Sequence, residues 1–230
     1  MTGSTGGEMN KKVAIFDLDG TLVDSLEAIS KIANSAFKDL GLKGCSLEDT
    51  KYLIGNGISG IAQKILSKDA TQEEVENTIL TIKKYYKEYW NYKLKLYDGI
   101  EELLDYLTQN NIKLAIYTNK DERFALETVG MVLSKWSFTH VVGASDDHPK
   151  KPDSYGIDKI LGDLGLVKEE GMYFGDMEVD VETGKNSQMY TVYCNWGFGN
   201  YKEMKFEEDL FLENPMDFSL EKLWGKSSND

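Results

Sequence analysis

The chain has 230 residues, 41% of them hydrophobic, and its 39 acidic and 26 basic side chains give a formal net charge of −13. This length and composition allow a full hydrophobic core, as one large domain or as one domain with a smaller insert. The negative charge argues against DNA, RNA or an anionic membrane as a partner, and no apolar run approaches the length of a membrane span.

The first predicted strand ends in a pair of aspartates. After residues 1–9, which we expect to form a flexible tail, the apolar run 13–16 predicts a buried parallel strand. Asp17 and Asp19 follow it at once, before a turn at Gly20. An ordinary turn explains Asp19 and Gly20, but it leaves Asp17 unexplained. Because a carboxylate at the end of an apolar strand is unfavourable unless a cation compensates it, the pattern indicates a functional site.

Residues 23–96 are expected to form an inserted domain made only of helices. Apolar side chains recur at helical spacing from Leu26 to Leu40 and from Ile58 to Leu66. Ser46 and Thr71 are each followed three residues later by an acidic residue, which is the pattern of a helix start. No strand pattern appears between the first aspartates and Lys95.

From residue 97 onward the pattern alternates between helix and strand. Apolar stripes predict helices, and apolar runs predict strands at 112–117, 139–142, 172–174 and 191–194. Such alternation indicates a parallel sheet built from right-handed crossovers. We therefore expect an α/β fold, in which a Rossmann-like parallel sheet with helices on both faces is formed by residues 10–22 and 97–230 and is interrupted by the helical insert.

Three further polar motifs follow predicted strands of this sheet. They are Thr118-Asn119-Lys120, Lys150-Lys151-Pro152, and the segment that contains Asp176 and Asp180. Each alone is a common turn or helix start. Because the carboxyl ends of parallel strands meet at one edge of a sheet, together they should surround the first two aspartates.

This set of side chains fits phosphoryl transfer through an aspartyl-phosphate. The reaction needs a carboxylate nucleophile, a divalent cation, donors for the phosphoryl oxygens and an acid/base group. Several carboxylates in one pocket repel each other, and a hard cation such as Mg²⁺, which prefers oxygen ligands, resolves that conflict. The motifs contain no histidine or cysteine, which argues against zinc.

The four motifs, in this order, resemble those of the haloacid dehalogenase superfamily of aspartate-nucleophile phosphatases, in the subgroup with a helical cap after the first motif. The similarity covers nearly the whole chain from residue 11 onward. It implies that Asp17 is the nucleophile and Asp19 the general acid/base. It also implies that Thr118 and Asn119 bind phosphate and that Lys151, rather than its neighbour Lys150, is the lysine of the third motif.

The resemblance also implies a set of metal-binding residues. Asp176 matches the metal-binding acid of the fourth motif, and Asp180 matches its supporting acid. In the family, Mg²⁺ is held by the positions that match the Asp17 carboxylate, the Asp19 carbonyl and Asp176. The second aspartate of the first motif also favours phosphate esters over carbon–halogen substrates, because dehalogenases lack it.

The end of the fourth motif departs from the family pattern. The family commonly runs Ala-x-x-Ala-Gly, whereas this chain has residues 184–188 as Gly-Lys-Asn-Ser-Gln. The missing glycine leaves the local helix end open to question.

The insert should select the substrate, which we expect to be a small phosphorylated metabolite. Gly55 and Asn56 lie in a stretch that resembles the Gly-Asn-Gly turn of phosphoglycolate phosphatases, where backbone N–H groups could approach a second anionic group. A plain turn between two helices explains the same residues equally well.

Two other functions remain open. A sugar phosphomutase of the β-phosphoglucomutase type shares the fold and nucleophile, although such enzymes usually carry valine or a similar residue where this chain has Thr21. A non-catalytic phosphate-binding protein is a further alternative. Cys45 and Cys194 have no metal-like spacing, which favours a reducing, cytoplasmic compartment. We expect a monomer or a homodimer.

Overall fold

The centre of the molecule is a six-stranded parallel sheet. The computed structural model describes residues 10–224, so the predicted tail at 1–9 lies outside the described residues. The strand order is β5-β4-β1-β6-β7-β8. The strands are β1 (Val13–Phe16), β4 (Lys113–Asp121), β5 (Phe138–Ala144), β6 (Gly171–Gly175), β7 (Tyr190–Cys194) and β8 (Leu210–Leu212). All five pairings are parallel, which confirms the predicted α/β fold.

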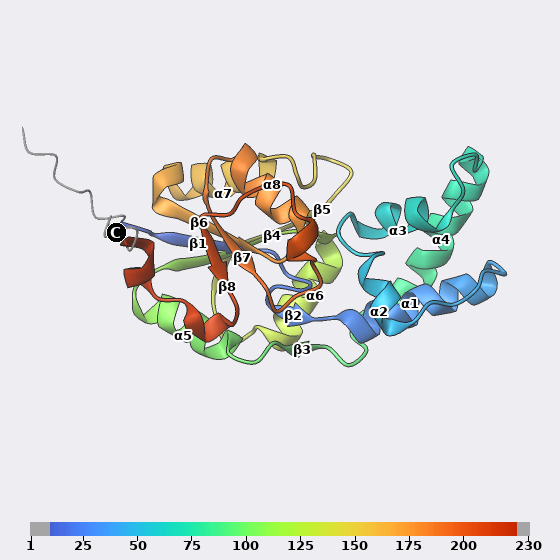
Figure 1. The fold of residues 1–230 in the computed structure, drawn as a ribbon, viewed down its shortest axis with the longest axis horizontal. Coiled ribbons are helices and arrows are strands. Elements are labelled where there is room, and N and C mark those ends of the chain that lie inside the picture. Colours follow the sequence, from blue (N-terminus) through green and yellow to red (C-terminus); the bar gives the residue numbers. More distant parts are fainter. Residues whose placement is uncertain (1–9, 225–230) are drawn as a thin grey trace, which may run out of the picture.

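Helices cover both faces of the sheet, as Figure 1 shows. They are α5 (Ile100–Gln109), α6 (Glu122–Val132), α7 (Tyr155–Leu164) and α8 (Glu178–Asn186). The alternation of side chains along β1 explains the two layers: Phe16 packs in one cluster with Leu103 of α5, while Ile15 packs in the other with Ile157 of α7. We call this sheet and its four helices the core.

Four helices lie apart from the sheet, at the right of Figure 1. They are α1 (Leu26–Asp39), α2 (Leu47–Lys51), α3 (Gly57–Ile65) and α4 (Gln72–Tyr89), and we call them the cap. The predicted helix starts at Ser46 and Thr71 are confirmed, because each side chain accepts a hydrogen bond from the backbone N–H three residues later in a capping box.

A two-stranded antiparallel ribbon joins the cap to the core. Its strands are β2 (Val23–Asp24) and β3 (Lys95–Leu96), at the two ends of the segment that the sequence pattern assigns to helices alone. Two residues are too few for an alternating pattern, so no sequence signal marks them. We propose that this ribbon is the boundary between the two parts of the chain.

The cap has its own hydrophobic core, and core residues contribute to it. Isoleucines of α1, α3 and α4 form a cluster with Tyr86, and the cluster includes Phe124 and Phe198 from the core. The rings of Tyr86 and Phe124 lie 4.8 Å apart, centroid to centroid. The cap is therefore packed against the same edge of the sheet to which the motif residues belong.

Short 3₁₀ helices complete the fold. They are η1 (Lys168–Glu170), η2 (Tyr201–Glu203), η3 (Pro215–Asp217) and η4 (Leu220–Trp224). α8 ends without the expected glycine: Gln188 itself takes the left-handed conformation, with φ of 56°. Within residues 10–224, no helix is both long enough and apolar enough to cross a membrane.

Candidate active site

Asp17 lies at the centre of the sheet edge because β1 is the central strand between β4 and β6. Its backbone N–H donates to the carbonyl of Phe174 at 2.8 Å, which fixes it beside the end of β6. The chain then turns at Gly20, where φ is 95° and an added Cβ would lie 2.4 Å from an Asp176 oxygen. Only glycine fits there, so the turn brings the first motif directly against the fourth.

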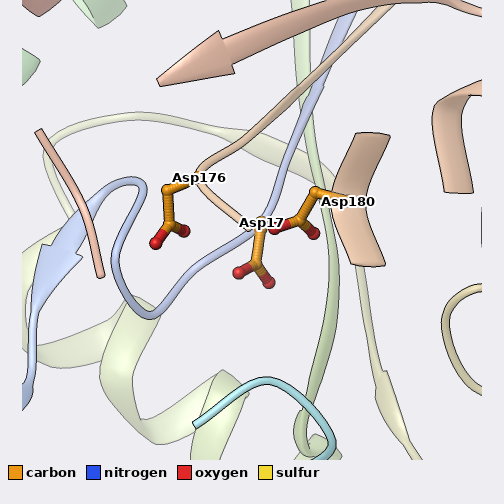
Figure 2. Close-up of side chains that lie close together, drawn as sticks. All are labelled: Asp17, Asp176 and Asp180. Atoms are coloured by element: carbon orange, nitrogen blue, oxygen red, sulfur yellow. The ribbon is translucent and has the colours of Figure 1, made fainter. Parts of the chain in front are cut away.

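Three aspartates converge at this edge, as Figure 2 shows. One carboxylate oxygen each from Asp17, Asp176 and Asp180 lies within 4.8 Å of the others, and all three residues are buried. Asp176 accepts hydrogen bonds from the Thr21 hydroxyl at 2.9 Å and from the Phe198 N–H at 2.8 Å. Burial, and then the neighbouring charges of the other two aspartates, raise the pKa of Asp176 well above its usual value.

Lys151 joins two of these aspartates. Its Nζ lies 2.7 Å from Asp17 Oδ1 and 2.6 Å from Asp180 Oδ1. Burial disfavours the ammonium, but the two carboxylates outweigh burial and raise the pKa of Lys151. Burial also raises the pKa of Asp17 to about 6, against the opposing charge of Lys151. Asp180 is held by the Tyr173 hydroxyl at 3.0 Å and by the Met177 N–H at 3.0 Å.

The second motif lies within the far end of β4, which runs beyond the predicted strand end at residue 117. The Asn119 side chain accepts from the Lys151 N–H at 2.9 Å and donates to the carbonyls of Lys151 at 3.2 Å and Gly55 at 3.0 Å. It thus ties the third-motif loop and the cap to the sheet. The Thr118 hydroxyl accepts from the Lys120 N–H at 3.3 Å.

Lys120 is a residue to which sequence reasoning assigned no role. Its Nζ donates to both Asp19 carboxylate oxygens at 3.0 Å, and its side chain is 1% exposed. Burial opposes its charge, but Asp19 and Tyr86 together outweigh burial and raise the pKa of Lys120. The available signal is a lysine at the end of a buried apolar strand, which the sequence places in the second motif without a role of its own.

A cavity of about 60 Å³ lies between the cap and the core. From the core it is lined by Asp17, Asp19, Thr118, Asn119, Lys120, Asp121, Lys151, Met177, Val179 and Asp180, and from the cap by Ile29, Ile54, Gly55, Gly57, Ile58, Ile61 and Tyr86. Of the two predicted cap residues, Gly55 reaches this cavity. Asn56 is not among the lining residues; instead its carbonyl accepts from Lys150 Nζ at 3.1 Å on the exposed side.

The aspartate cluster fits a hard divalent cation. All its donors are carboxylate oxygens, which Mg²⁺ prefers. Asp17 Oδ1 is buried and accepts no hydrogen bond of good geometry within the described residues, although Lys151 lies beside it. The Asp19 side chain is not part of the cluster, since Lys120 holds it. The resemblance assigns the Asp19 carbonyl, not its carboxylate, to the metal. The pairing of the carboxylate with Lys120 is compatible with that assignment.

A comparison with family models decides the class of the protein. The model for haloacid dehalogenase-like hydrolases matches residues 14–194, which span β1 to β7 and include all four motifs. The chain belongs to this family. As a haloacid dehalogenase-like protein it is an enzyme of the hydrolase class, and the resemblance seen in the sequence is confirmed.

Relatives of this haloacid dehalogenase-like hydrolase include phosphoglycolate phosphatases. The phosphoglycolate phosphatase of Aquifex aeolicus is 30% identical over 187 residues, which cover 81% of this chain and 86% of the relative. The phosphoglycolate phosphatase of Aliivibrio fischeri is 25% identical, over 82% of this chain and 86% of its own length.

Solved structures share the whole fold. A protein of Lactobacillus delbrueckii subsp. bulgaricus superposes with a TM-score of 0.85 at 24% identity, covering 94% of this chain and all of its own. A haloacid dehalogenase-like family protein of Streptococcus pneumoniae gives a TM-score of 0.82 at 24% identity, over 90% of this chain and 96% of its own. These likenesses confirm the fold of both core and cap.

Proposed function

We propose that the protein is a Mg²⁺-dependent phosphatase that hydrolyses a small phosphorylated metabolite through a phosphate ester on Asp17, with phosphoglycolate as the leading substrate. The observation that carries the proposal is the state of Asp17. This carboxylate is buried at the end of the central strand, lies at a cavity, and presents an oxygen without a well-formed hydrogen bond beside Lys151. A solvated turn would leave the carboxylate exposed, and a purely structural ion pair would have no need to lie at a cavity.

Asp17 and Asp19 would divide the chemistry between them. In the first half, an Asp17 oxygen attacks phosphorus, the ester P–O bond breaks, and Asp19 gives its proton to the departing alkoxide. In the second half, Asp19 takes a proton from water and the water oxygen bonds to phosphorus. The bond between phosphorus and the Asp17 oxygen then breaks, which releases inorganic phosphate and restores the free Asp17 carboxylate. Asp19 thus regains in the second half the proton that it gives up in the first.

The other residues would position these two. Lys151 holds Asp17 through its 2.7 Å contact and is anchored in turn by Asp180. Thr118 lines the cavity from the far end of β4, where its hydroxyl could donate to a phosphoryl oxygen. Asp17, Asp176 and the Asp19 carbonyl would hold the cation, with Asp180 in support. When bound, Mg²⁺ supplies positive charge for the phosphoryl oxygens.

The proposed substrate class rests on the relatives and on the size of the cavity. The relatives named above are phosphoglycolate phosphatases. A cavity of about 60 Å³ is far below the ~300 Å³ at which pockets for drug-sized ligands begin. It favours a two- or three-carbon ester over a sugar phosphate. We also propose that Gly55 and the backbone around Asn56 form part of the wall that the substrate meets.

A substrate panel tests this function. We expect wild-type protein with Mg²⁺ to release phosphate from phosphoglycolate faster than from hexose phosphates, nucleoside monophosphates or pyrophosphate. Asp17→Asn should lower kcat by at least ~10³-fold, because the side chain keeps its shape but loses its nucleophilic oxygen. Asp39→Asn, an exposed cap carboxylate that pairs with Lys84, is the matched control and should leave the rate unchanged.

The panel also separates the alternatives. Turnover that requires a sugar bisphosphate activator would identify a phosphomutase. Phosphate binding without metal-dependent release from any ester would identify a non-catalytic protein. Either result would overturn the proposal.

A further inference from the structure

The cavity contains a buried cation that the proposed hydrolysis does not use. Lys120 has a side chain that is only 1% exposed, and its partner Asp19 is 13% exposed. An ammonium has three donors. Two of the Lys120 donors point to the two Asp19 oxygens, both 3.0 Å away. The third donor faces the cap residue Tyr86, whose ring centroid lies 5.5 Å from the same nitrogen and whose hydroxyl helps to raise the pKa of Lys120, so a ligand at this donor would compete with Tyr86.

The second buried cation of the cavity, Lys151, is already paired with two aspartates. Lys151 lies within 2.7 Å of both Asp17 and Asp180, and a divalent ion at the aspartate cluster would serve the phosphoryl group. Among the described lining residues, Lys120 and Lys151 are the basic ones. Among the charged side chains that line the cavity, only Lys120 is therefore left as a partner for a second anionic group on the substrate.

The cap side of the cavity offers no competing charge. Its side chains are those of Ile29, Ile54, Ile58, Ile61 and Tyr86, and its glycines are Gly55 and Gly57. An anion placed against the isoleucines would lose its hydration without compensation. The small volume also favours a second group that lies close to the phosphoryl group. These constraints leave the space beside Lys120 as the place for it.

We propose that Lys120 is a specificity-determining residue that binds the substrate carboxylate and so selects phosphate esters with a carboxylate on the carbon that bears the ester oxygen. The proposal rests on the phosphatase function above and names the residue that recognises its substrate. Lys120 contacts Asp19 on the core side and approaches Tyr86 on the cap side, so a carboxylate bound to it would lie where the cap closes over the acid/base residue.

The test compares two substrates in one variant. Phosphoglycolate and ethyl phosphate have the same chain length and differ in the carboxylate. In Lys120→Met, we expect the ratio of their kcat/KM values to fall by about 10- to 100-fold, the usual worth of a charged hydrogen bond. Damage to Asp19 would lower kcat/KM equally for both substrates and leave their ratio unchanged. An unchanged ratio would therefore overturn the proposal.

Controls make the outcome specific. Lys120→Arg should keep most of the preference, because it keeps the positive charge. Lys150→Met removes a nearby exposed cation that reaches the cap but does not line the cavity, and its ratio should match wild type. If Lys120→Met does not fold, the neutral and similarly long Lys120→Gln carries the same test.

Failure of the function and failure of this inference look different. If wild-type protein hydrolyses neither ester, the proposed function is wrong. If wild-type protein prefers phosphoglycolate and Lys120→Met keeps that preference, the function stands and Lys120 only positions Asp19.

Discussion

The core and the cap meet at one cavity, yet they contribute opposite kinds of surface to it. The core contributes the motif aspartates Asp17, Asp19 and Asp180 and the lysines Lys120 and Lys151, nearly all buried and paired with one another. The cap contributes isoleucines, a tyrosine and two glycines. The charged surface of the core can bind the phosphoryl group of any ester, whereas the apolar surface of the cap can distinguish substrates by their shape. The division implies that changes to the core aspartates should abolish chemistry, whereas changes to Lys120 or to the cap should alter selectivity.

The largest effect should follow from removing a core carboxylate that would hold the metal. Losing a residue that only supports a metal ligand commonly costs about 10- to 100-fold in affinity. Asp176→Asn removes a direct charge, so we expect Mg²⁺ binding to weaken by at least ~100-fold in calorimetric titration. Asp163→Asn, an exposed carboxylate that pairs with Lys159, should bind Mg²⁺ as wild type does. Equal affinities for all three proteins would place the metal elsewhere.

The second effect concerns stability and pH in protein treated with a chelator. Burial raises the pKa of Asp17 to about 6, and that of Asp176 rises in the same direction. Between the unfolded value near 4 and the folded value near 6, the folded state binds more protons, so stability falls as pH rises. We expect the free energy of unfolding in urea to drop by about 1 to 2 kcal/mol from about pH 5 to about pH 7.

Two comparisons sharpen the pH experiment. Asp17→Asn should show a smaller drop, because one of the carboxylates that lose protons is gone. Added Mg²⁺ should restore stability at neutral pH, since it binds the folded state. If the free energy of unfolding rises from about pH 5 to about pH 7, and does so equally in wild type and Asp17→Asn, the raised pKa values of the buried aspartates are contradicted.

The smallest effect should come from the cap turn. Gly57 has φ of 66°, and an added Cβ would lie 2.8 Å from the Asn119 carbonyl of the core. Gly57→Ala should push the cap away from β4 and raise KM several-fold while kcat changes less. Gly41→Ala is the matched control, because Gly41 has φ of 68° with nothing near its Cβ position. Identical kinetics in the two variants would show that this contact does not seat the cap.

The long elements of both the core and the cap were predictable from the sequence, whereas the short strands were not. Apolar runs marked β1, β4, β6 and β7, which are buried on both faces, and β5, whose residues are mostly half-buried. β8 was missed, since it has only three residues next to the acidic stretch 207–209, and the ribbon strands β2 and β3 were too short to leave a pattern. The helix starts at Ser46 and Thr71 were predictable because capping boxes are local.

The candidate site was predictable where its chemistry is encoded in short motifs. Asp17, Asp176, Asp180 and Lys151 follow strands whose order places them together, and the structure brings them within contact distance. The pairing of Lys120 with Asp19 was not predictable, because it joins residues 101 positions apart and depends on how two strands align. The apolar cap surface of the cavity was also not predictable, since isoleucines at helical spacing indicate only a packed helix face.

The central claim is that Asp17 receives the phosphoryl group, and trapping that ester tests it most directly. Wild-type protein would be mixed with Mg²⁺ and phosphoglycolate, quenched in acid within the first turnover and digested for mass spectrometry. The account predicts the added mass of one phosphoryl group on the peptide that contains Asp17, and no such mass in Asp17→Asn. A phosphoryl group on any other residue, or rapid turnover with no modified peptide in wild type or variant, would contradict it.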